Sequence, residues 1–192
     1  MRLTLLVMIV FAVAAVLGLG ATLRAVTHGL PIGGLTIGPW RADPDIGGLG
    51  ADPYLRAGVA RRGEAPLAYG DGVAFEARTD DAGRSLDAAC DYTLEGDLPA
   101  ARLWTLMPFS PEGGRLETAL GRRGTSSAET VRVIGRPIVV ELSQTAKAGD
   151  WIQLPAKGAF VLRLALYDTA LGTPLARRTP PQLLAVKRGA CR

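Results

Sequence analysis

The feature that most constrains the fold is an uninterrupted apolar run at the start of the sequence. Residues Leu3–Leu23 contain no charged side chain, and Arg2 and Arg24 flank the run. Folded as an α-helix, a run of this length rises about 31 Å, which is enough to cross the hydrocarbon core of a bilayer. The sequence therefore predicts a transmembrane anchor at residues 1–24.

A secretory signal peptide that is later removed is the second interpretation of this run. The small residues Gly18, Gly20 and Ala21 would then form the cleavage site. The run exceeds the apolar region of about 7–15 residues that signal peptides carry, which favours a retained anchor. Both interpretations place the rest of the chain outside the cytoplasm.

The two cysteines, Cys90 and Cys191, are consistent with such a compartment. In an oxidising environment an even count favours a disulfide. This bridge would close a loop of about 100 residues and fix the C-terminal end of the chain to a strand. The alternative is one buried and one exposed thiol. There is no CxxC motif, so the sequence indicates neither a redox centre nor a zinc site.

The excess of positive charge does not indicate nucleic-acid binding. The net charge is +4, but the basic residues are scattered with acidic residues between them, and no basic helix interleaved with aromatic residues is present. We therefore interpret the basic pairs as solvated surface and expect no nucleic-acid partner. These pairs are Arg61-Arg62, Arg122-Arg123 and Arg177-Arg178.

After the anchor, residues 25–51 are expected to form a juxtamembrane linker and a first strand, and residues 52–192 to form one β-rich domain. That domain begins with DPYLRAGVARRG, which predicts a short helix. Asp52 is a natural N-cap, Pro53 suits the first helical position and Gly63 suits the end.

Most of the domain alternates apolar and polar residues with a period of two, as half-buried strands do. TSSAETVR (residues 125–132) is a candidate for a further short helix, capped by Thr125 or Ser126. Several short strands with few helices predict a mainly β fold, an antiparallel sandwich or jelly-roll-like domain with one or two short helices. The expected strands include VAFEAR, CDYTLE, RLWTLM, PIVVEL and FVLRLAL.

The clearest alternation lies in FVLRLAL and sets two faces. The face expected to point inward carries Phe160, Leu162, Leu164 and Leu166. The opposite face carries Val161, Arg163, Ala165 and Tyr167. Because Arg163 lies in a strand, it needs a partner, for which Asp168 or Glu141 is expected. The preceding segment SQTAKAGDWIQLPAKG is long for a hairpin loop, so it is expected to pack on the domain with Trp151 as its anchor.

Three stretches together resemble an uncharacterised bacterial family labelled domain of unknown function twelve-fourteen. They are DPYLRAGVARRGEAPL, then YTLEG followed by ARLWTLMPFSPEGGRL, then GDWIQLPAKGAFVLRLALYDT. Members usually show an aromatic-Trp strand, an Asn-Trp-Leu-Pro-type loop and a strand closing in Arg-Leu-Tyr-Pro. This chain departs from the pattern with Asp150 in place of Asn and Asp168 in place of Pro.

The resemblance implies a β-rich, jelly-roll-like domain of a bacterial protein and no particular activity. It also implies a companion, because the family often occurs beside or fused to domain of unknown function twelve-fifty-four. A separately encoded protein of that companion family is therefore the expected partner. The expected location is the bacterial inner membrane, crossed once, with the domain in the periplasm; the alternative is a domain released to the periplasm after signal cleavage.

The side-chain inventory argues against common catalytic chemistries. The single histidine, His28, lies beside the apolar run, so a Ser-His-Asp triad or a histidine-rich metal site in the domain is not expected. No nucleotide-binding glycine motif follows a strand. We therefore expect no catalytic residues, no metal and no cofactor, and favour a protein that is not an enzyme, although a pair of carboxylates stays open.

A ligand or partner face is the remaining candidate site, built from aromatic and arginine side chains on a sheet. Two functional hypotheses follow. The first is a non-catalytic interaction or assembly module, which predicts buried Trp side chains. The second is a protein that binds or hydrolyses envelope carbohydrate or lipid headgroups, which predicts exposed Trp and converging acids. The candidate face comprises Trp104, Trp151, Arg163, Tyr167 and Asp150.

Overall fold

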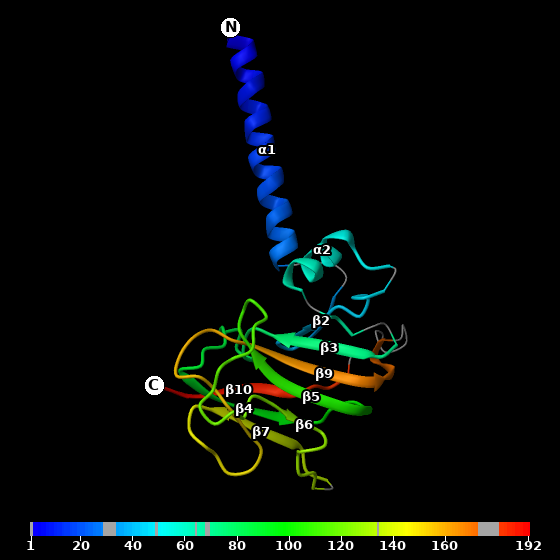
Figure 1. The fold of residues 1–192 in the computed structure, drawn as a ribbon, viewed down its shortest axis with the longest axis vertical. Helices are drawn as coiled ribbons and strands as arrows, with labels where there is room; N and C mark the ends of the chain where they lie inside the picture. The colour runs from blue at the N-terminus through cyan, green and yellow to red at the C-terminus, as the bar shows by residue number, and fades with distance from the viewer. Residues whose placement is uncertain are drawn as a thin grey trace.

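The protein consists of a long N-terminal helix, a short second helix and two β-sheets packed face to face (Figure 1). A mainly β sandwich preceded by an apolar helix is thus confirmed. The Gly-rich start of the expected linker lies outside the described residues. The computed structural model describes residues 2–28, 34–48, 50–63, 65–67, 70–133, 135–172 and 181–192.

The first helix, α1 (Arg2–His28), extends away from the sheets (Figure 1). Its stretch Arg2–Thr27 is long and apolar enough to cross a membrane, and the apolar window within it is not buried in the protein. Apolar side chains are exposed on all sides of the helix. This surface is consistent with a membrane anchor or with a signal sequence.

The second helix, α2 (Pro53–Arg62), begins and ends where the sequence predicts. The Asp52 carboxylate accepts hydrogen bonds from the backbone N–H groups of Tyr54 and Leu55, at 2.8 and 3.4 Å. Gly63 ends the helix in the left-handed conformation, with φ of 63°, which costs a glycine little. The helix contacts α1 and lies between it and the sheets (Figure 1).

The first sheet has six strands, and every neighbouring pair is antiparallel. Its central strand, β9, pairs with β3 on one side and β5 on the other along most of its length. A 3-10 turn, η1 (Ala170–Gly172), follows β9. In spatial order the strands are β1 (Leu35–Ile37), β2 (Trp40–Ala42), β3 (Gly72–Ala77), β9 (Val161–Thr169), β5 (Ala101–Phe109) and β6 (Thr125–Ser126).

The second sheet has four strands, in the order β10 (Ala185–Cys191), β4 (Cys90–Gly96), β7 (Ile138–Ser143) and β8 (Trp151–Gln153). The pair β7–β8 is parallel, so this sheet is mixed. The sequence predicted a packed loop at this position. All three residues of β8 are buried, so no alternation marked the strand in advance.

The hydrophobic core lies between the two sheets and follows the predicted alternation. Leu162, Leu164 and Leu166 of β9 have no exposed surface, and they face Tyr92 and Leu142 of the second sheet across one shared cluster. Each fully buried side chain of this size contributes about 1.5–3 kcal/mol by leaving water. The opposite face of β9, which includes Arg163, therefore points away from the second sheet.

The C-terminal strand is attached to both sheets. Cys191 lies opposite Cys90 in the β10–β4 ladder, and the two form the disulfide expected from the sequence. In addition, the Trp40 indole N–H of β2 donates to the carbonyl oxygen of Leu184, at 2.6 Å, just before β10 begins. The C-terminus is thus fixed covalently to one sheet and by a buried hydrogen bond to the other.

The helix expected at residues 125–132 does not form. Thr125 and Ser126 instead form β6, the edge strand that pairs with Leu106 and Thr105 of β5, and residues 127–130 form a turn. Both Glu129 and Thr130 donate their backbone N–H to the Ser126 carbonyl oxygen, at 3.0 Å. A cap signal followed by a short segment suits a turn as well as a helix, and pairing with β5 decides between them.

Candidate functional site

The outer face of the six-stranded sheet, turned away from the four-stranded sheet, carries rows of side chains set by the strand register. The middle row contains only small side chains and is flanked on β9 by the larger Arg163 and Tyr167. The sheet surface is therefore lower along this row than on either side of it. Across β3, β9 and β5 the rows are Glu76, Arg163 and Met107; Ala74, Ala165 and Thr105; and Gly72, Tyr167 and Leu103.

A groove of about 920 Å³ lies over this low row, and we call it the outer-face groove. The sheet forms its floor, and α2, the loop after β2 and the last turn of α1 form its walls. Apolar groups line more of it than polar groups do. Among its lining residues are Val26, Thr27, Arg41, Ile46, Tyr54, Leu55, Ala74, Glu76, Arg78, Met107, Phe109, Arg163, Ala165 and Tyr167.

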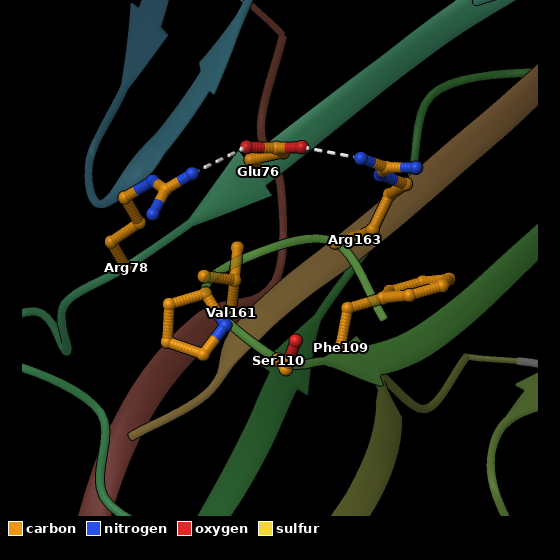
Figure 2. A pocket seen from close by; sticks show the side chains of 8 residues that line it. Glu76, Arg78, Phe109, Ser110, Val161 and Arg163 are labelled. Carbon is orange, nitrogen blue, oxygen red and sulfur yellow. Dashed lines mark hydrogen bonds and ion pairs between the residues drawn. The ribbon is translucent and has the colours of Figure 1, made fainter. Parts of the chain in front are cut away.

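A charged cluster occupies one side of the outer-face groove (Figure 2). The Arg163 guanidinium donates to Glu76 Oε1 at 2.7 Å, and Arg78 donates to Glu76 Oε2 at 3.4 Å. The Arg163 guanidinium carbon also lies 4.9 Å from the centre of the Phe109 ring. One carboxylate thus lies between two guanidinium groups, and an aromatic face supports one of them.

The structure places the sequence-predicted site residues in three different locations. Arg163 and Tyr167 both line the outer-face groove. Trp104 is on the opposite, core side of the same sheet and only 4% exposed. Trp151 is in the other sheet, 5% exposed, where its indole N–H donates to the Ser143 carbonyl oxygen at 3.1 Å. Asp150, half-buried, precedes Trp151 there. The candidate face of five residues is therefore not one continuous surface.

The prediction that Asp168 or Glu141 would pair with Arg163 was wrong. Glu141 is in the four-stranded sheet, where both its carboxylate oxygens accept from the Thr93 hydroxyl at 3.1 Å. Asp168 is exposed near the far end of β9. The observed partner, Glu76, lies directly opposite Arg163 in the β3–β9 ladder. The register between strands that are far apart in sequence decides the pairing, and no local pattern reports it.

Sequence reasoning also missed several groove residues. Glu76, Met107 and Phe109 occupy outward positions on β3 and β5, and Tyr54 is on α2. The alternation in VAFEAR placed Glu76 outward, but nothing local showed which other strands share that face. The outward positions of β3, β5 and β9 can be assigned to one shared face once the antiparallel order of these strands is known.

A second charged cluster ties the turn after β3 to the C-terminal strand. The Asp80 side chain is 1% exposed, and its Oδ1 accepts from the backbone N–H of Ala82 and Arg84, at 3.0 and 2.9 Å. Its Oδ2 accepts from Arg84 Nε at 2.9 Å and lies 3.1 Å from Arg188 Nε of β10. This carboxylate links two segments that are about a hundred residues apart.

The electrostatics of Asp80 follow from these contacts. Burial by itself raises the pKa of the carboxyl group, but the backbone and side-chain hydrogen bonds from Arg84 and the charges of Arg84 and Arg188 outweigh burial. The pKa of Asp80 is therefore lowered from its ordinary value of 3.8. The group remains ionised at neutral pH, and its contacts with the described residues join parts of the fold.

Comparisons with solved structures find similarity to two bacterial proteins. The VPA0106 protein from Vibrio parahaemolyticus matches with a TM-score of 0.58 and 15% identity, over 73% of this chain and 36% of that chain. A putative uncharacterized protein from Burkholderia cenocepacia matches with a TM-score of 0.46 and 15% identity, over 90% of this chain and 41% of that chain. The chain thus spans well under half the length of either. At such identity, the first match shows a shared fold.

No curated protein matches this chain. A family model with the description "Protein of unknown function (DUF1214)" matches residues 71–171, more than half of the sequence. The match contains β3, β9 and β5, which form the floor of the outer-face groove, and most of the second sheet. It confirms the resemblance read from the sequence. The chain therefore belongs to the DUF1214 family of proteins of unknown function.

Proposed function

We propose that this chain is a single-pass protein of the bacterial inner membrane whose β domain, in the periplasm, is a non-catalytic module that binds an amphipathic ligand in the outer-face groove. The observation that carries the proposal is the position of that groove. Val26 and Thr27, in the last turn of the apolar helix, line the same groove as Phe109 and Tyr167 of the sheet. Anchoring of α1 would hold the groove at the membrane surface.

The size and lining of the outer-face groove support a binding role. Ligand pockets are commonly about 300–1,000 Å³, mostly apolar, with a few fixed polar groups. This groove falls in that range, and its polar groups include the guanidinium groups of Arg78 and Arg163. The disulfide between Cys90 and Cys191 supports the oxidising compartment in this proposal.

The acids around the outer-face groove support binding rather than catalysis. Glu76 is held between Arg163 and Arg78, and Asp52 accepts two backbone N–H groups at the start of α2. Asp43, the third acid of the lining, accepts a hydrogen bond from the backbone N–H of Asp45 at 3.2 Å. All three carboxylates therefore already have structural partners. Carbohydrate binding by stacking on tryptophan is also less favoured, because Trp104 and Trp151 are both buried.

A second candidate function is docking onto another envelope protein. The observation that favours it is that the matched domain of the Vibrio protein accounts for only 36% of a longer chain. The expected partner is a protein of the companion family, domain of unknown function twelve-fifty-four. Docking through a surface outside the outer-face groove would be compatible with an occupied groove.

One purification tests both functions. We expect the full-length protein, isolated from membranes in detergent, to retain an organic molecule that mass spectrometry detects in a solvent extract. The variant Ala74→Trp fills the groove floor and should retain at least tenfold less, a loss of about 1.4 kcal/mol of binding free energy. The control Val139→Trp, on an exposed strand position of the other sheet, should retain the wild-type amount.

The outcomes separate the two candidates. Equal retention by both variants would contradict a ligand in the outer-face groove. A protein recovered in near-equal amount with the wild type and with Ala74→Trp would instead support docking on another surface. Circular dichroism and an intact disulfide check that each variant is folded.

A further inference from the structure

We infer that the occupant of the outer-face groove is a phospholipid of the bilayer that surrounds α1, with its phosphate at Arg78 and an acyl chain on the groove floor. This inference rests on the proposed function, because it requires α1 to be in a membrane.

The continuity between α1 and the groove supports a lipid. The apolar side chains of α1 are exposed along its length, so in a membrane the helix is surrounded by acyl chains. Val26 and Thr27, at the end of this surface, form part of the groove wall. The molecules that lie against the last turn of α1 are therefore the molecules that reach the groove without crossing water.

The floor of the groove suits an acyl chain. Ala74 and Ala165 face each other in the β3–β9 ladder, with Thr105 beyond them on β5. These short side chains leave a low track between Arg163 and Tyr167. A flexible apolar chain that lies on Ala74 and Ala165 buries apolar surface without covering a charged group. Across the groove, Leu55 and Ile46 supply an apolar wall.

The polar side of the groove suits a phosphate. Arg78 makes one hydrogen bond to Glu76, at 3.4 Å, and its side chain is 60% exposed. A guanidinium group has five N–H donors in a planar fork, which is a geometry that matches phosphate oxygens. The contact to Glu76 orients the fork and leaves donors for a headgroup at the rim of the groove.

Fluorescence quenching in lipid nanodiscs tests the inference. The full-length variant Phe109→Trp, which we call the groove reporter, places an indole in the groove and keeps an aromatic face beneath Arg163. The nanodiscs contain phospholipids brominated on their acyl chains, which quench tryptophan only at close approach. The native Trp40, Trp104 and Trp151 are at most 5% exposed and supply the background measured with the wild type.

Two controls accompany this variant. Val13→Trp, which we call the α1 reporter, is at a 51% exposed position midway along α1 and reports whether the helix is in the bilayer. Val139→Trp, on the outer face of the other sheet, reports quenching that does not depend on the groove. The double variant Phe109→Trp with Ala74→Leu narrows the floor and should restore the fluorescence of the groove reporter.

The expected result is quenching of the groove reporter comparable with that of the α1 reporter, relieved in the double variant, with the Val139→Trp control unaffected. Quenching of the α1 reporter without quenching of the groove reporter overturns the lipid inference and leaves the proposed function standing for another ligand, such as a protein segment. An unquenched α1 reporter overturns membrane anchoring, and the lipid inference with it. Groove quenching that the double variant does not relieve also overturns the inference, because it reports contact with the bilayer surface alone.

Discussion

Removal of the Cys90–Cys191 disulfide is expected to lower the free energy of unfolding of the β domain by about 2–5 kcal/mol. The two cysteines are 101 residues apart in sequence. In the chain-entropy account, closing a loop of that length lowers the conformational entropy of the unfolded chain and so raises its free energy by about 4.7 kcal/mol. Domains of ordinary size have a total stability of only about 5–15 kcal/mol. The double variant Cys90→Ala with Cys191→Ala should therefore melt roughly 10 °C below the wild type.

Differential scanning calorimetry of the full-length protein in detergent measures this shift. Wild-type protein treated with a reductant is the matched comparison, since it loses the bond without losing either side chain. A melting temperature that changes by less than about 2 °C in both samples would contradict the structural role of the bond. Thiol labelling of unreduced, denatured protein from intact cells should find no free cysteine.

Replacement of Asp80 by Asn is expected to cost about 3 kcal/mol of unfolding free energy at neutral pH. Asp80→Asn removes the buried negative charge that pairs with Arg188 and Arg84. The Arg188 side chain, which is only 14% exposed, then loses its counter-ion. The expected cost lies at the low end for a buried ion pair, because the Arg84 side chain is 57% exposed and water solvates its charge when Asp80 is removed. Asp97→Asn, an exposed position, is the control and should change stability by no more than about 0.5 kcal/mol.

The pH dependence of stability distinguishes this role of Asp80 from simple packing. Because its pKa is lowered in the folded state, its contribution is fully present above the ordinary value of 3.8 and is lost as the pH falls from there toward the folded pKa. Urea unfolding of wild type and Asp80→Asn should therefore differ most at neutral pH and converge in acid. A difference that stays constant from pH 7 to acid would contradict the electrostatic account.

The sequence predicted the elements whose cause is local. The caps of α2 were readable from Asp52, Pro53 and Gly63, because a cap acts within a few residues. The inward positions of β9 were readable because strand alternation needs no partner. The disulfide was readable because only one pairing exists for two cysteines.

The groove and its ion pair could not be predicted in the same way, because they depend on register between distant strands. Arg163 meets Glu76 only because β9 pairs with β3 in one particular alignment. The same alternation that placed Leu106 in the core placed Trp104 there too, so an aromatic residue that suggested a ligand face is a core residue. Strand β8 was missed because its three residues are all buried and show no period.

An experimental structure of the full-length protein, purified from its own membranes in mild detergent, tests the central claim most directly. We expect elongated ligand density in the outer-face groove, lying over Ala74 and Ala165 with a compact end beside Arg78. A groove that contains only ordered water, or that is closed by side chains of the protein itself, would contradict it.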